Sequence, residues 1–181
     1  MQEIMDWIND NDRLTRFLWL NGPAGAGKSA IEQTIAELCH QMNLLAASFF
    51  FARSVNGRNN KTFLITTIVD QLIESIPEIR EHVGITLYNN PSLLKRSLEA
   101  QMEELVVKPL KMAASAGVDF MNSRPKVIVL DGLDECGDPE SQRYVLKVRP
   151  FVVWWKRGGD GRNEEEGALC DELKMNSHVT S

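Results

Sequence analysis

The chain has 181 residues, a formal net charge of −5, and hydrophobic and charged fractions of 43% and 25%, as expected for one globular domain. The negative charge argues against sequence-independent nucleic-acid binding, which needs a positive surface that displaces counterions. No apolar run reaches the roughly 18 residues of a membrane-spanning helix, and the acidic N-terminus does not resemble a secretion signal. The three cysteines have neither zinc-site nor disulfide spacing, so we expect a reducing, cytoplasmic location, with no nucleic-acid or membrane partner.

Apolar residues alternate between helical and strand patterns along the first 148 residues. The expected elements, in chain order, are a helix at 3–9, a strand at 16–22, a helix from 28 to 42, a strand at 44–53, a helix at 61–76 that Pro77 ends, a helix from Asn90 that Pro109 ends or kinks, a strand at 125–132 and a helix at 139–148. Strands that alternate with helices at this spacing predict an α/β fold with a parallel sheet.

A glycine-rich loop lies between the first expected strand and the helix that follows it. Gly22, Gly27, Lys28 and Ser29 have the spacing of the Walker A motif, in the strand–loop–helix context that the motif requires. Such a loop surrounds phosphates with backbone N–H groups, while the lysine contacts the outer phosphates and the serine binds magnesium. The predicted nucleotide-binding residues are Gly22, Pro23, Ala24, Gly25, Ala26, Gly27, Lys28, Ser29 and Ala30.

Three carboxylates follow the last buried strand, in the stretch "VIVLDGLDEC". Asp131 at the strand end is in the Walker B position, where it would hold Mg²⁺ opposite Ser29. Parallel strands end at a common edge of the sheet, so we expect this aspartate to lie near the glycine-rich loop. Asp134 and Glu135 are candidate catalytic residues, with Glu135 the better candidate for the base that polarises the attacking water. The alternative, that both are solvated loop acids, stays open.

Three segments, "FLWLNGPAGAGKSAI", "SFFFAR" and "KVIVLDGLDEC", together resemble the NACHT class of STAND signalling NTPases, and fungal members in particular. The resemblance covers residues 1–148 and implies a P-loop NTPase fold, with a parallel sheet in a three-layer α/β/α arrangement. It also implies a switch that binds ATP or GTP with Mg²⁺ and hydrolyses it slowly. Protein partners, or self-association through a family-type assembly, are further implications.

Residues 149–181 depart from this family pattern and are predicted to be an atypical, disordered tail. In the family, the strand after Walker B lies between the two nucleotide-binding strands and ends in a polar sensor residue. Residues 151–155 are apolar enough to form a strand there, but no polar sensor follows. We therefore expect an incomplete fold in which this strand is missing or replaced, as in a truncated or mis-spliced product. Hydrolytic competence is accordingly left open.

Two alternatives to the signalling switch remain from the sequence. One is a nucleotide-binding fragment that does not hydrolyse its ligand. The other is a small-molecule or nucleotide kinase, for which Arg53 and Arg58 are the nearby arginine candidates. The base is also unassigned, with ATP as the default, because Phe63 stands where a guanine-reading NKxD element needs aspartate. Cys136 is expected to be a small packed residue, since neighbouring acids suppress its thiolate.

Overall fold

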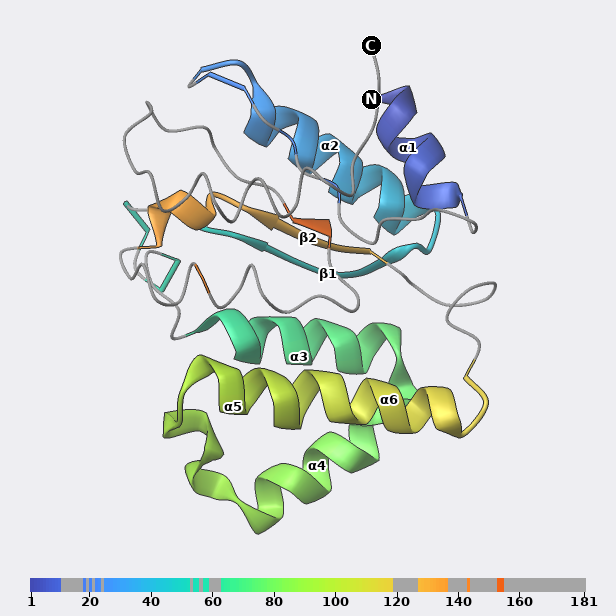
Figure 1. Ribbon diagram of the computed structural model, residues 1–181, viewed down its shortest axis with the longest axis vertical. Helices are drawn as coiled ribbons and strands as arrows, with labels where there is room; N and C mark the ends of the chain where they lie inside the picture. Colours follow the sequence, from blue (N-terminus) through green and yellow to red (C-terminus); the bar gives the residue numbers. More distant parts are fainter. Residues whose placement is uncertain are drawn as a thin grey trace.

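The computed structural model describes residues 1–10, 18, 20, 22–23, 25–52, 54–55, 57–58, 63–118, 127–136, 143 and 153–154. These residues form a parallel sheet between two layers of helices (Figure 1). The strand order is β1 (Leu45–Phe50), β2 (Val127–Asp131) and β3 (Val153–Trp154). The α-helices are α1 (Gln2–Asn9), α2 (Lys28–Gln41), α3 (Leu64–Ser75), α4 (Arg80–Asn89), α5 (Leu98–Met102) and α6 (Lys108–Ser115). The expected α/β architecture with a parallel sheet is confirmed.

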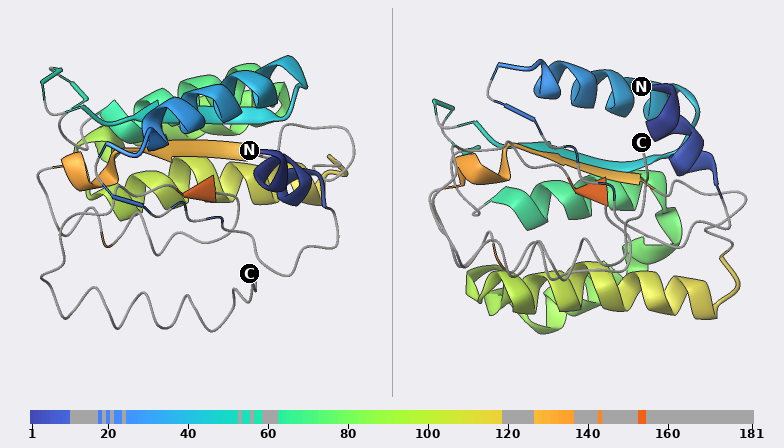
Figure 2. Two further views of the ribbon diagram at one scale, coloured as in Figure 1. Left: turned by 90° about the horizontal axis from the view of Figure 1, so that it is seen from above. Right: turned by 45° about the horizontal axis from the view of Figure 1, so that its top comes forward.

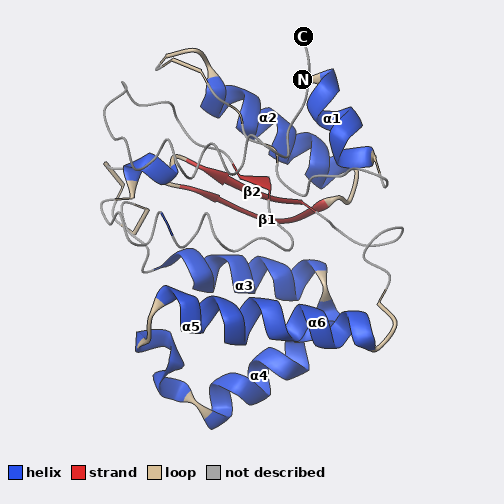
Figure 3. Ribbon diagram, in the orientation of Figure 1, coloured by secondary structure: helices blue, strands red, loops and turns tan. Residues whose placement is uncertain are grey.

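Both faces of the sheet are covered, which explains why its strands are almost continuously apolar. Helices α1 and α2 lie on one face, and α3, α5 and α6 lie on the other (Figure 2, Figure 3). All five residues of β2 are buried. Ile8, Ile35 and Val129 belong to the apolar cluster under α1 and α2. Ile68 and Leu105 belong to the larger cluster on the opposite face.

The outer edge of β1 is closed by side chains of α3. The Gln71 amide accepts a hydrogen bond from the Ser48 N–H and donates one to the Ser48 carbonyl, both at 2.9 Å. One turn further on, the Ser75 hydroxyl donates to the Ala46 carbonyl at 2.8 Å. Ala46 lies within the register shift between Leu45 and Ala47, and Ser48 follows that shift. The helix thus satisfies the strand-edge groups that would otherwise offer a template for another strand.

Replacing Gln71 with alanine is expected to lower the free energy of unfolding by about 1–3 kcal/mol, because the Ser48 N–H and carbonyl both lose their partners. Urea denaturation followed by circular dichroism measures this. Gln33→Ala is the matched control, since Gln33 is exposed and bonds to Glu37 on the same helix. Its effect should stay within about 0.5 kcal/mol. Equal losses in the two variants would contradict the role assigned to Gln71.

Pro109 does not end its helix, so the prediction that the helix stops there is wrong. A five-residue π-helical segment, Glu103–Val107, joins α5 to α6, and Pro109 lies in the first turn of α6. In a regular α-helix, proline lacks the N–H for its hydrogen bond, and its ring clashes with the carbonyl four residues earlier. The wider π-helical turn before Pro109 relieves this clash.

The helix also starts later than predicted. Residues Pro91–Lys95 form a 3-10 helix, and α5 begins after Ser97, whose hydroxyl accepts a hydrogen bond from the Ala100 N–H at 3.3 Å.

Helix α4 was not anticipated from the sequence, because its apolar residues do not gather on one face. Val83 is buried, whereas Ile85 and Tyr88 are exposed by 52% and 87%. The sequence also predicts an apolar stripe of Phe63, Ile68, Leu72 and Ile76 on the helix expected at 61–76, but Phe63 precedes α3 and is 53% exposed. The other three members of the stripe, Ile68, Leu72 and Ile76, are buried as expected, and Leu64, Ile65 and Val69 are buried with them.

The segment after residue 148 contributes β3, which pairs in parallel with β2 on the side opposite β1. A short strand therefore forms in the segment where the sequence predicts that the family's strand is missing or replaced. The other residues of 149–181 lie outside the described set, as do most residues of the expected strand at 16–22 and the expected helix at 139–148. Leu18 and Leu20 are partly buried against the cluster under α1 and α2. Among the described helices, none is long and apolar enough to cross a membrane.

Candidate functional site

The glycine-rich loop enters α2 through backbone conformations that favour glycine. Gly25 and Gly27 have φ angles of 81° and 77°, in the left-handed region. Gly27 is the N-cap residue directly before α2, and its carbonyl accepts a hydrogen bond from the Ile31 N–H at 3.1 Å. The Ala26 N–H donates to the Pro23 carbonyl at 3.2 Å, which closes a turn just before the helix. Ala24 lies outside the described residues.

Lys28 is the first residue of α2 and is only 6% exposed. Its ammonium group donates hydrogen bonds to the Gly22 and Pro23 carbonyls, at 2.5 and 2.6 Å. The side chain therefore folds back across the loop and places a positive charge inside it. An ammonium group has three donors, so two bonds leave capacity for an additional acceptor.

The next residues of α2 continue the same site. Ser29 is half-buried in the first helical turn, and Ala30 is exposed. Glu32 is 1% exposed, one turn after Lys28. This buried carboxylate was not predicted as a site residue from the sequence. The one feature that could have indicated its burial is its place one turn after Lys28, between the apolar Ile31 and Ile35.

Asp131 ends β2 and is 7% exposed. Its carbonyl accepts a hydrogen bond from the Phe51 N–H at 2.9 Å, so the ends of β1 and β2 are joined at this point. Gly132 follows with a φ angle of 68°, and a Cβ atom added there would lie 2.9 Å from the Phe51 carbonyl oxygen. Glycine is therefore required after Asp131 for both conformation and space.

A 3-10 helix, Leu133–Glu135, turns the chain immediately after Gly132. The Glu135 N–H donates to the Gly132 carbonyl at 2.7 Å, and the Glu135 residue is half-buried. The backbone of Asp134 belongs to this turn, but its side chain lies outside the described set. Cys136 is 2% exposed and belongs to the larger apolar cluster, which confirms that it is a packed residue.

The loop and the acidic strand end lie at the same edge of the sheet. The N-terminal end of α2 and the carboxyl ends of β1 and β2 are found at one end of the molecule in every view (Figure 1, Figure 2). Since Lys28 begins α2 and Asp131 ends β2, the two predicted halves of the site share this edge. The arrangement combines buried positive charge, loop and helix N–H groups, and carboxylates.

The donor set at this edge suits magnesium. A serine hydroxyl and one aspartate are the kind of ligands that Mg²⁺ uses when phosphate oxygens and waters complete its coordination. The described side chains include no cluster of three or more His, Cys, Asp or Glu residues arranged to hold a metal ion. An ion held by Ser29 and Asp131 would complete its coordination with oxygens of a bound ligand and of water.

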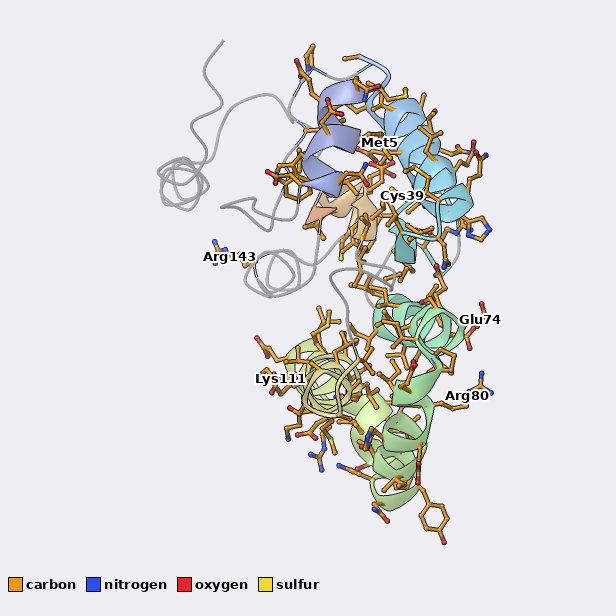
Figure 4. The ribbon with its side chains drawn as sticks, turned by 90° about the vertical axis from the view of Figure 1, so that its right-hand side faces the viewer. Met5, Cys39, Glu74, Arg80, Lys111 and Arg143 are labelled. Atoms are coloured by element: carbon orange, nitrogen blue, oxygen red, sulfur yellow. The ribbon has the colours of Figure 1, made fainter. Side chains whose placement is uncertain are left out.

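Cys39, the other cysteine that the structure describes, is buried and has a structural role. Met5 and Cys39 lie between α1 and α2, away from the carboxyl edge of the sheet (Figure 4). Burial of Cys39 raises the pKa of its thiol to about 11, so the reactive thiolate is suppressed at neutral pH.

Three charged side chains, Glu74, Arg80 and Lys111, extend outward from their helices (Figure 4). Arg53, a candidate phosphate ligand, lies outside the described residues.

Comparison with known proteins gives one family. The model of the family described as nephrocystin 3, N-terminal, matches residues 1–153. No curated protein and no solved structure shows a significant match. The family shown is therefore not the NACHT class that the sequence motifs resemble, and the matched region ends five residues beyond the boundary predicted at residue 148. Because the match covers most of its length, the chain belongs to the nephrocystin 3 N-terminal family.

Proposed function

We propose that this chain is a P-loop nucleotide-binding module of the NACHT/STAND type, which binds ATP or GTP with Mg²⁺ and hydrolyses it slowly as a conformational switch. The observation that carries the proposal is the buried Lys28, held across a glycine-rich loop at the sheet edge where Asp131 ends β2. A positive charge in a loop of N–H groups suits polyphosphate, and a neighbouring carboxylate suits the metal that accompanies it.

Each residue of the site then has a defined task. The loop N–H groups and the N-terminal end of α2 would hold the phosphates, and Lys28 would contact the outer ones. Ser29 and Asp131 would hold Mg²⁺, which neutralises charge on the phosphate oxygens. Glu135, with Asp134 as the alternative, would accept the proton of the water that attacks the terminal phosphate.

Titration of the full chain with ATP and GTP, with and without Mg²⁺, beside a phosphate-release assay, tests this proposal. Magnesium-dependent binding with slow phosphate release supports the switch. Binding without release would indicate a module that only holds nucleotide, and release that depends on an added acceptor would indicate a kinase. A folded chain that binds neither nucleotide would contradict the proposal.

Replacing Glu135 with glutamine is expected to preserve nucleotide binding and to reduce phosphate release by about 10²- to 10⁴-fold, because the amide cannot accept the proton from water. Single-turnover phosphate release and a binding titration measure the two effects separately. Glu74→Gln is the matched control, since Glu74 is exposed near the C-terminal end of α3 and its side chain points outward (Figure 4). If Glu135→Gln reduced binding and left the hydrolysis step intact, Glu135 would not be the base.

A further inference from the structure

Helix α4 exposes apolar side chains on the face that points away from the rest of the chain. Val83 is the buried residue of this helix, whereas Ile85 and Tyr88 are exposed. Residues three or four positions apart share one face of a helix, so Glu81, Ile85 and Tyr88 lie in one row. Gly84 borders this row, and a Cβ atom added to it would meet nothing within 4 Å. We call these four residues the outer face of α4.

This face lies at the end of the molecule opposite α1 and α2. Helices α3, α5 and α6 separate α4 from the sheet (Figure 1, Figure 3). Helix α4 packs against the 3-10 helices on either side of it in sequence, Pro77–Ile79 and Pro91–Lys95, and against the π-helical segment Glu103–Val107. The outer face of α4 is therefore remote from the proposed nucleotide site and independent of its function.

Opposite charges stand at the two ends of the outer face. Glu81 is exposed in the first turn of α4 and forms no ion pair with the side chains that the structure describes. At the other end, the exposed Arg96 donates a hydrogen bond to the side-chain carbonyl of Asn90, the C-cap residue of α4, at 3.5 Å. Lys95 beside it is also exposed. Arg80 is about 100° around the helix from Glu81 and so lies to one side of the row.

We propose that the outer face of α4 binds the same face of a second copy of this chain, with the two helices antiparallel across a two-fold axis. Glu81 lies about 14 Å along the helix from Asn90, so an axis midway between them passes close to Ile85. The half-turn brings Glu81 of each copy opposite Arg96 of the partner subunit, because the contact is isologous. Tyr88, one turn from the axis, then covers Gly84 of the partner subunit, where no side chain blocks it.

The order of charges is the reason for choosing a second copy as the occupant. A row that is acidic at one end, apolar in the middle and basic at the other matches itself after a half-turn. A membrane surface would instead favour cations along the whole polar part of the helix. Because a ten-residue helix is only about 15 Å long, the contact is smaller than a standard interface. We therefore expect a weak dimer, with a dissociation constant on the order of 10–100 µM.

Sedimentation velocity of the full chain, over concentrations that bracket this dissociation constant, tests the pairing. Ile85→Asp should weaken dimer formation at least about tenfold, because it places a charge at the centre of the contact on both copies. Tyr88→Ser should also weaken it, and this residue is too exposed for its loss to unfold the chain. Met112→Asp is the matched control, since Met112 is 49% exposed on α6. It should dimerise as the wild type does.

Exchange of the two charges tests the antiparallel arrangement. Glu81→Arg places two arginines opposite each other, and Arg96→Glu places two glutamates opposite each other, so each should weaken the dimer about 3- to 10-fold at low ionic strength. The double variant restores opposite charges at both ends and should recover the wild-type affinity within about twofold. Thermal melting shows that each variant is folded.

A folded wild-type chain that stays monomeric throughout the concentration range would refute the pairing. A dimer that Ile85→Asp leaves intact, or that Met112→Asp weakens equally, would mean that another surface makes the contact. Failure of the double charge exchange to restore affinity would rule out the antiparallel arrangement. Nucleotide titration of Ile85→Asp should match the wild type, so loss of dimerisation and loss of the proposed nucleotide binding are separate results.

Discussion

Replacing Lys28 with alanine is expected to weaken binding of the triphosphate by about 10- to 100-fold, the effect of losing hydrogen bonds from a charged donor. The ammonium group is buried inside the loop, where its attraction to phosphate is screened less than at the surface. Isothermal titration of wild type and variant with a non-hydrolysable triphosphate and Mg²⁺ measures the change. ADP affinity should also fall.

Lys111→Ala is the matched control for this experiment. Lys111 is exposed on α6, which lies on the opposite side of the sheet from α2 (Figure 1). The control should bind nucleotide as the wild type does. The Lys28 side chain also bonds to the Gly22 and Pro23 carbonyls, so a melting curve must show that the variant remains folded. A folded Lys28→Ala protein with unchanged affinity would refute the phosphate-binding role of the loop.

Replacing Gly132 with alanine is expected to lower the free energy of unfolding by about 2–4 kcal/mol. One part is the left-handed conformation, because a side chain at a φ angle of 68° is strained. The other part is the added Cβ atom, 2.9 Å from the Phe51 carbonyl oxygen, which forces the ends of β1 and β2 apart. Urea denaturation measures the loss, and the same displacement should weaken Mg²⁺-dependent binding through Asp131.

Gly84→Ala provides the opposite result with the same chemical change. Gly84 lies exposed within α4, and an added Cβ atom there would meet nothing within 4 Å. Alanine at this site should raise the free energy of unfolding by about 0.5–1 kcal/mol, because it restricts the unfolded chain and favours helix. If both substitutions changed stability in the same direction, the close approach at Gly132 would not explain its glycine.

The part of the candidate site that could be predicted is the part encoded by neighbouring residues. The loop from Gly22 to Ser29 and the strand end at Asp131 were recognisable because their spacing sets which backbone groups meet a ligand. Glu32 was not assigned as a site residue, because its relevance depends on where the folded chain places it. In the sequence, Glu32 is one polar residue among several on a predicted helix.

Hydrophobic patterning along the sequence by itself determined the strands β1 and β2, the helices α1, α2 and α3, and their alternation, because apolar period and length are local properties. Only the tertiary structure decided how Gln71 closes the β1 edge, how the chain passes Pro109, and which residues lie beside Asp131. The Gln71–Ser48 contact joins residues 23 positions apart, and that between Phe51 and Asp131 joins residues still further apart. Such contacts form when whole elements pack together, so no short-range pattern contains them.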